Sequence, residues 1–131
     1  MKHNLFDLTG KIAIITGAAK GLGRAIAEGY ADYGASVALV DIDLEGVERV
    51  TEMIRAHGGT ATAIECDVSN EKQVEAAVAQ TVNTFGQVDI MANVASISGR
   101  CPAEEMPYQL WDRVIDINLR GCFLFSVLAG K

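Results

Sequence analysis

Thr16-Gly17-Ala18-Ala19-Lys20-Gly21-Leu22-Gly23 stands between an apolar, β-branched run and a segment with helical periodicity. The run from Lys11 to Thr16 is strand-like, and residues 21–33 favour a helix. A glycine-rich turn from a strand into a helix is typical of a dinucleotide-binding fold. The apolar stripe of the predicted helix consists of Leu22, Ile26 and Tyr30.

Each glycine of this turn has its own expected task. Gly17 permits the tight turn, Gly21 lets the backbone approach a pyrophosphate, and Gly23 allows close helix packing. The free N–H groups at the helix N-terminus attract anionic oxygens. Three glycines alone could equally form a plain tight turn, but the strand before them, the helix after them and an acid downstream favour a nucleotide site.

That acid is Asp41, which follows Gly23 by 18 positions and ends a second predicted strand. A dinucleotide fold needs a carboxylate there for the adenosine ribose hydroxyls. A 2′-phosphate at about 4 Å would be repelled by roughly 4 kcal/mol before screening, so we expect NAD rather than NADP. Lys20 tempers this preference, because its ammonium could accompany a phosphate. Alternatively, Asp41 could be a helix N-cap and Lys20 a solvated charge.

Strands and helices alternate through the rest of the chain. Further strands are predicted at 36–41, 60–65 and 88–92. Between them, one helix ends at Gly58-Gly59 and the next stops at Gly86. Ser69 or Asn70 caps the second of these helices, and Pro107 can sit in the first turn of a last helix. The predicted buried stripes are Leu44, Val47, Val50 and Ile54, then Val74, Val78, Val82 and Phe85, then Trp111, Val114, Ile115 and Asn118.

Apolar strands separated by amphipathic helices imply a parallel sheet covered on both faces, a doubly wound, Rossmann-type α/β fold. The handedness of the crossovers gives the strand order 3-2-1-4, with the fourth strand at an edge. We expect residues 1–131 to form one dinucleotide-binding domain. An apolar edge strand and an apolar end without a following strand also lead us to expect a truncated, incomplete sheet.

Composition narrows the possible partners. The net charge of −6 and the pI of about 4.8 argue against nucleic acid. Residues 1–7 lack the pattern of a signal peptide, and no apolar stretch reaches about 18 residues, so we expect a cytoplasmic protein without a membrane partner. Three widely spaced cysteines fit neither a disulfide framework nor a metal site, and reduced thiols are expected at Cys66, Cys101 and Cys122.

The spacing Thr-Gly-x-x-x-Gly-x-Gly resembles that of the short-chain dehydrogenase/reductase family, and the resemblance extends over nearly the whole chain. It includes Cys66-Asp67-Val68, which touches adenine in the family, Asn93 after the fourth strand, and the signature at 111–121. The glycine turn and the resemblance together predict a cofactor site formed by Gly17, Lys20, Gly21, Leu22, Gly23, Asp41, Ile42, Asp67, Val68, Asn93 and Ala95.

The resemblance gives Asn118 an auxiliary catalytic role, in which a local break in its helix lets it hold a water of the proton relay. The alternative is a buried, hydrogen-bonded asparagine. Two residues depart from the family pattern Asn-Asn-Ala-Gly after the fourth strand. Val94 replaces an amide, and Ser96 puts a side chain where a glycine lets the backbone approach the nicotinamide side.

The family's catalytic serine and Tyr-x-x-x-Lys pair cannot be placed in this chain. Tyr30, Tyr33 and Tyr108 lack a lysine four positions later. His3, at the chain start, and His57, at a helix end, are expected to be surface residues. Tyrosine and lysine move the proton in the family, so we expect this chain alone not to be catalytic.

The resemblance implies the NAD(H)-binding part of an oxidoreductase that, when complete, transfers hydride between NAD and an alcohol or ketone such as a sugar, polyol or keto acid. A homo-oligomer is expected, with a small-molecule substrate only in the complete enzyme. The alternative is a non-catalytic nucleotide-binding module, or a self-associating one that buries its edge strand and final helix. Extended-type epimerase relatives fit less well, because their glycine spacing differs.

Overall fold

The computed structural model describes residues 5–131, so the prediction for His3 lies outside the described residues. Its sheet has four parallel strands in the order β3-β2-β1-β4. Doubly wound topology and strand order are therefore confirmed. The strands are β1 (Ile12–Thr16), β2 (Ser36–Asp41), β3 (Thr60–Glu65) and β4 (Ile90–Ala92).

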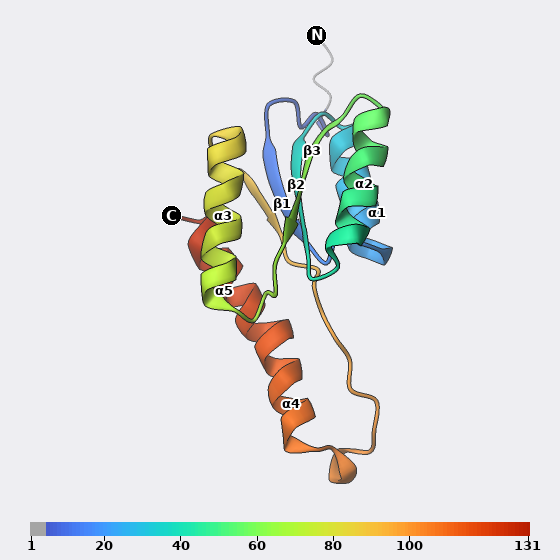
Figure 1. Cartoon of the computed structure of the whole chain (residues 1–131), viewed down its shortest axis with the longest axis vertical. Helices are drawn as coiled ribbons and strands as arrows, with labels where there is room; N and C mark the ends of the chain where they lie inside the picture. Colours follow the sequence, from blue (N-terminus) through green and yellow to red (C-terminus); the bar gives the residue numbers. More distant parts are fainter. Residues whose placement is uncertain (1–4) are drawn as a thin grey trace.

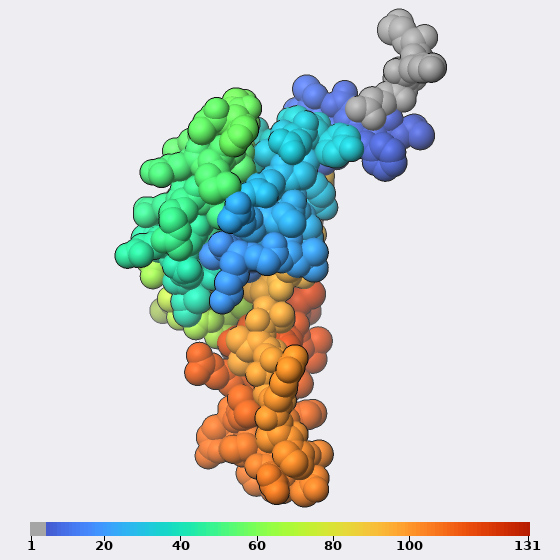
Figure 2. All heavy atoms as spheres, turned by 90° about the vertical axis from the view of Figure 1, so that its right-hand side faces the viewer, coloured from blue at the N-terminus to red at the C-terminus, as the bar shows by residue number. Residues whose placement is uncertain are grey.

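Helices cover both faces of this sheet (Figure 1). One face carries α1 (Gly21–Asp32) and α2 (Leu44–Ala56), and the other carries α3 (Glu71–Phe85) and α5 (Gly121–Ala129). A further helix, α4 (Tyr108–Ile115), projects with the preceding segment beyond the carboxyl ends of the strands. Figure 2 shows the same segment as a narrow extension of the molecule.

The central strands separate the core into two layers. Successive side chains of a strand point to opposite faces, so Ala13 and Ile15 of β1 pack with α1 and α2, whereas Ile14 packs with α3 and α5. All five residues of β1 are buried, as a parallel strand covered by helices requires. Strand β1 thus contributes side chains to both core layers.

Side-chain caps begin two of the helices. Asp43 caps α2 by accepting a hydrogen bond from the Gly46 N–H at 3.0 Å, so Asp41 is not the N-cap. Asn70 caps α3 by accepting from the Gln73 N–H at 3.2 Å. Of the two predicted capping residues, Asn70 is therefore the one used.

Three predicted buried stripes need correction. Leu22 of α1, Val82 of α3 and Trp111 of α4 are exposed by 68%, 41% and 56%. The buried face of α3 runs instead through Val74 and small side chains, with Thr81 satisfied by its hydrogen bond to the Ala77 carbonyl. Helical periodicity alone locates a buried stripe only to within about one residue. In α3 the small residues Ala77 and Thr81 face the core, so the buried stripe lies beside the predicted one.

Strand β4 is shorter than predicted, because Asp89 ends the ladder. The Asp89 N–H donates to the Ile12 carbonyl at 2.8 Å, while the Ile12 N–H donates to the Asp89 carboxylate at 2.9 Å. A side chain thus replaces the strand carbonyl that would continue the pairing. The hydrogen bond from Ile12, aided by one from Gln87, holds the pKa of Asp89 below its ordinary value.

The predicted last helix is interrupted. A π-helical turn, η2 (Asp116–Arg120), joins α4 to α5, and Pro107 is the N-cap residue directly before α4. The turn includes Asn118, so the break implied by the family resemblance is present. Among residues 5–131, no helix is long and apolar enough to cross a membrane.

We expect Phe125→Ala to lower the free energy of unfolding by about 3–5 kcal/mol, because Phe125 is fully buried between α5 and the sheet. Denaturant titration measures this loss at a protein concentration low enough to keep the chain monomeric, so that self-association does not contribute. Phe123→Ala is the matched control on the same helix, and its exposed ring predicts a change within about 0.5 kcal/mol. Equal losses for the two variants would contradict the described packing of α5.

We also expect Cys66 to resist thiol reagents in the native protein, whereas the exposed Cys122 reacts. Burial, with a smaller effect of the Asp67 charge, raises the pKa of the Cys66 thiol to about 12. The neutral thiol is favoured in the folded state, so its contribution to stability is complete below about pH 9 and is lost as the pH rises through about 12. Alkylation at pH 8 with peptide mass spectrometry tests this, and equally fast labelling of both cysteines would refute it.

Candidate functional site

A cavity of about 830 Å³ opens at the carboxyl ends of β1, β2 and β3. Ligands of doubly wound folds bind at this edge of the sheet. A second cavity of about 550 Å³ adjoins it and contains Asn93 and Asn118, while Gly21 lines neither. The predicted cofactor residues that line the larger cavity are Gly17, Lys20, Leu22, Gly23, Asp41, Ile42, Asp67, Val68 and Ala95.

The turn after β1 depends on two glycines. Gly17 has a φ of +69°, and a Cβ there would lie 2.9 Å from both the Cα and the N of Ala95. A Cβ on Gly23 would collide with the Gly17 carbonyl. Both positions therefore exclude a side chain, as expected for a tight turn against a closely packed helix.

The N-terminus of α1 faces the larger cavity. Lys20 is its N-cap residue, and the Lys20 side chain makes no capping hydrogen bond. The backbone N–H groups of the first turn are thus not satisfied by a side-chain cap. Together with the helix dipole, such groups form an anion-binding site suited to a pyrophosphate.

Asp41 holds the turn after β1 against the end of β2. Its carboxylate accepts hydrogen bonds from the Ala19 N–H and the Asp43 N–H, both at 3.1 Å. A carboxylate has about four acceptor positions, so two bonds leave capacity for ribose hydroxyls. Asp41 therefore both fixes the turn and presents negative charge to the cavity.

The loop after β3 forms another wall. Asp67 accepts hydrogen bonds from the N–H and the hydroxyl of Ser69, at 2.9 and 2.7 Å. Its own N–H donates to the Gln73 side chain at 2.7 Å. Val68 packs under Gly121 so closely that a Cβ on Gly121 would lie 2.8 Å from a Val68 methyl group. The loop is fixed by α3 and by the start of α5.

Thr16 latches the loop after β4 to the end of β1. Its hydroxyl oxygen accepts hydrogen bonds from the Val94 N–H at 3.0 Å and the Ala95 N–H at 3.2 Å. Thr16 is itself 2% exposed. Sequence reasoning assigned it no role, although a polar side chain at the end of an apolar strand was a usable signal.

Asn118 clamps the same loop from the other side. Its Oδ1 accepts from the Ile97 N–H at 2.9 Å, and its Nδ2 donates to the Ile97 carbonyl at 2.8 Å. The side chain is exposed at the second cavity rather than buried. Asn93 at the end of β4 is tied to α5 through its Nδ2, which donates to Ser126 at 3.1 Å.

The two departures from the family pattern cause no backbone strain. Among the described residues, no residue other than glycine has a positive φ, so Ser96 fits its position without a left-handed conformation. Val94 keeps its backbone hydrogen bond to Thr16 and packs its side chain against the core layer of α1 and α2. The loop after β4 therefore keeps its hydrogen bonds to Thr16 with Val94 and Ser96 in the sequence.

Helix α4 and the first residue of η2 add a wall that sequence reasoning did not identify. Gln109, Arg113 and Asp116 line the larger cavity together with Asp112. The spacing of the first three, four and then three residues apart, places them on one helix face. Arg120 continues this face to the β3–α3 loop, where it lies 3.4 Å from the Ser69 carbonyl and 3.8 Å from the Glu71 carboxylate.

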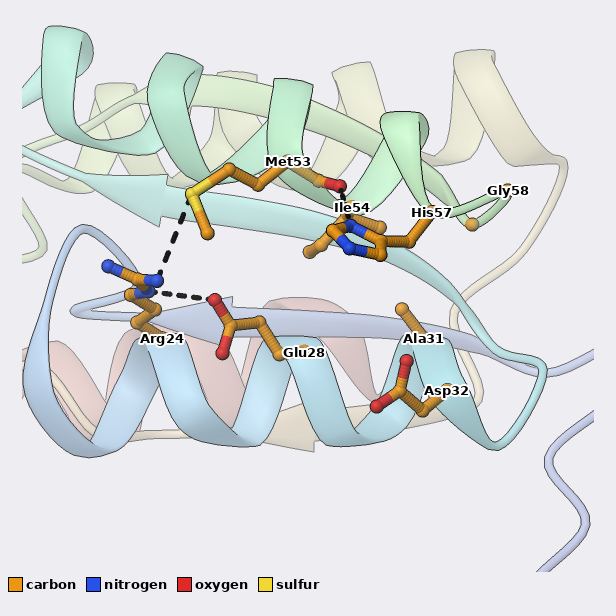
Figure 3. A pocket seen from close by; sticks show the side chains of 9 residues that line it. Arg24, Glu28, Ala31, Asp32, Met53, Ile54, His57 and Gly58 are labelled. Carbon is orange, nitrogen blue, oxygen red and sulfur yellow. Dashed lines mark hydrogen bonds and ion pairs between the residues drawn. The ribbon is translucent and has the colours of Figure 1, made fainter.

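A third hollow, of about 530 Å³, lies between α1 and α2 (Figure 3). Within it, Arg24 pairs with Glu28 at 2.7 Å, and His57 Nδ1 lies 2.8 Å from the Met53 carbonyl. His57 is an exposed residue at the end of α2, as predicted. No group of three or more side chains suited to a metal occurs within residues 5–131.

Comparisons with known proteins agree with this geometry. A family model for short chain dehydrogenases matches residues 11–130. A D-threitol dehydrogenase of Mycolicibacterium smegmatis is 41% identical over 126 residues, which are 96% of this chain and 48% of that protein. An NAD-dependent glycerol dehydrogenase of Listeria innocua is 35% identical, with the same coverage.

Solved structures show the same similarity. The crystal structure of a hydroxysteroid dehydrogenase from Escherichia coli superposes with a TM-score of 0.91 at 36% identity, covering 95% of this chain and 52% of that one. A short-chain type dehydrogenase/reductase from Mycobacterium marinum gives 0.92 at 37% identity, with 95% and 51% coverage. The chain spans about half the length of the curated relatives it matches. On the strength of the fold, the glycine turn and the family match, the chain belongs to the short-chain dehydrogenase family of oxidoreductases.

Proposed function

We propose that residues 1–131 form one dinucleotide-binding domain, the NAD(H)-binding part of an oxidoreductase that acts on an alcohol or ketone. The observation that carries this proposal is the larger cavity, which joins the glycine turn, the uncapped N-terminus of α1 and the carboxylates of Asp41 and Asp67. An anion-binding turn beside a ribose-binding carboxylate suits a dinucleotide.

Three groups of residues would hold the cofactor. The first-turn N–H groups of α1, with Gly17 and Gly23 giving close access, would bind the pyrophosphate. Asp41 would accept the adenosine ribose hydroxyls, with Lys20 and Ile42 nearby. Asp67 and Val68 would border the adenine, and Asn93 and Ala95 the nicotinamide half.

The charge of the cavity supports NAD over NADP. Five aspartates line it, at positions 41, 43, 67, 112 and 116, against Lys20 and Arg113. A 2′-phosphate would enter a region of net negative charge beside Asp41, at an unfavourable energy. One relative is named as NAD-dependent, which is consistent with this preference.

The bound cofactor would supply hydride transfer: NADH gives a hydride to a carbonyl carbon, and NAD+ takes one from a hydroxyl-bearing carbon. Relatives named for threitol and glycerol make a polyol or its ketone a reasonable substrate class for the complete enzyme. The clamp by Asn118 fixes the loop beside the second cavity, which suits an auxiliary role there. No tyrosine of this chain is followed four positions later by lysine, so we propose that these residues bind cofactor without turnover. The cytoplasmic location remains a prediction.

In calorimetric titration, we expect the 131-residue chain to bind NAD at least tenfold more tightly than NADP at equal salt concentration, a difference of about 1.4 kcal/mol. Asp41→Asn should reduce that ratio, because it removes the charge that opposes the 2′-phosphate but keeps one acceptor oxygen for the turn. Asp32→Asn removes the same charge at the far end of α1 and should leave the ratio unchanged. Absence of NAD binding would refute the proposed function, and tighter NADP binding would refute the preference.

We further propose that the chain self-associates through one side of η2 and α5. Leu119, Phe123 and Val127 recur every four residues there and are exposed by 63%, 62% and 42%. Helix α5 contains no charged residue. An uncharged, apolar, exposed helix side is typical of an interface, and a second copy would cover it isologously.

Phe123→Glu should weaken self-association at least tenfold in sedimentation equilibrium, because it places a charge in the centre of this apolar side. Leu5→Glu is the control, since Leu5 is 90% exposed and lies outside η2 and α5 in the sequence. A chain that stays monomeric at high concentration, or a dimer insensitive to Phe123→Glu, would contradict the proposed interface.

A further inference from the structure

The two cavities at the carboxyl edge of the sheet share one boundary. Among the described residues, six line both of them, and five of the six have apolar side chains: Leu22, Val68, Val94, Ala95 and Ile117. The sixth is Ser96, whose hydroxyl is therefore the one side-chain hydrogen-bonding group at the boundary. A ligand that occupies both cavities has to pass it.

The Ser96 hydroxyl is available to such a ligand. Ser96 is exposed, and its hydroxyl makes no hydrogen bond within residues 5–131. Other serines near the site are already engaged: Ser69 bonds to Asp67, and Ser126 accepts from Asn93. A serine hydroxyl offers one donor and two acceptor positions, so Ser96 can serve a partner of either kind.

The backbone holds Ser96 in place on both sides. The Ala95 N–H is bound by the Thr16 hydroxyl at 3.2 Å, and both backbone groups of Ile97 are bound by the Asn118 amide at 2.9 and 2.8 Å. Neighbouring residues on each side are thus anchored, one to β1 and one to the π-helical turn. A group presented from such a position loses little freedom when it binds.

The position along the cofactor follows from the proposed function, on which this inference rests. The adenosine half would lie by Asp41 and Asp67 in the larger cavity, and the pyrophosphate by the first turn of α1. The next group toward the second cavity is the ribose of the nicotinamide half. Its two hydroxyls match a serine hydroxyl in hydrogen-bonding character.

We propose that Ser96 is a specificity-determining residue of this site, whose hydroxyl hydrogen-bonds to the nicotinamide-side ribose and so favours ligands that extend past the pyrophosphate. The contact is one that a glycine or alanine at this position could not make. It is made by this chain's own side chain, in addition to the backbone and carboxylate contacts proposed above.

Three ligands separate the possible contacts in calorimetric titrations of the 131-residue chain. ADP ends at the pyrophosphate, ADP-ribose adds the second ribose, and NAD adds the nicotinamide. Loss of one hydrogen bond corresponds to a roughly two- to twelvefold weaker Kd. We expect Ser96→Ala to weaken the binding of ADP-ribose and of NAD by such a factor. The Kd of ADP should stay unchanged.

The control is Ser98→Ala, an exposed serine of the same loop that lines neither cavity, and it should change none of the three dissociation constants. Thermal denaturation of both variants shows whether the fold is kept, and Ser96→Thr, which restores a hydroxyl, tests recovery if Ser96→Ala is unstable. Equal weakening of ADP by Ser96→Ala would move the contact to the pyrophosphate and overturn the ribose assignment. Unchanged Kd values for all three ligands would overturn the inference alone, whereas failure of the unaltered chain to bind ADP would overturn the proposed function with it.

Discussion

The contact between Gly17 and Ala95 determines how the site is built. It brings the loop after β1 against the loop after β4, at a distance that no side chain at position 17 would allow. The Thr16 hydroxyl holds the two loops together by accepting hydrogen bonds from the N–H groups of Val94 and Ala95. Because β1 is buried on both faces, neither loop can shift without disturbing both core layers.

The sequence predicted the fold well where one physical rule acts alone. Strands β2 and β3 have the predicted bounds, and the caps at Asn70 and Gly86 begin and end α3 as expected. The strand order followed from crossover handedness. Prediction was poorer where a tertiary contact competes with periodicity, as at β4, which the Asp89 side chain shortens by replacing a strand carbonyl.

The residues of the candidate site also fall into those that the sequence predicted and those that it did not. Gly17, Gly23 and Asp41 were found because a turn between a strand and a helix has a fixed spacing. The cavity wall formed by α4 and the start of η2 was not predicted. The spacing of Gln109, Arg113 and Asp116 indicates a shared helix face, but it does not indicate which part of the protein that face lines. The clamp between Asn118 and Ile97 also depends on two segments, 21 residues apart, whose approach the sequence does not specify.

Strand β4 has a consequence for the order of folding. Strands β1, β2 and β3 pair with their sequence neighbours, whereas the hydrogen bond from Val94 to Thr16 joins residues 78 apart. Closing that longer loop costs more chain entropy and contributes to slow folding. The three-strand unit can therefore form before the loop after β4 reaches β1, in which case the boundary between the two cavities is completed after that unit.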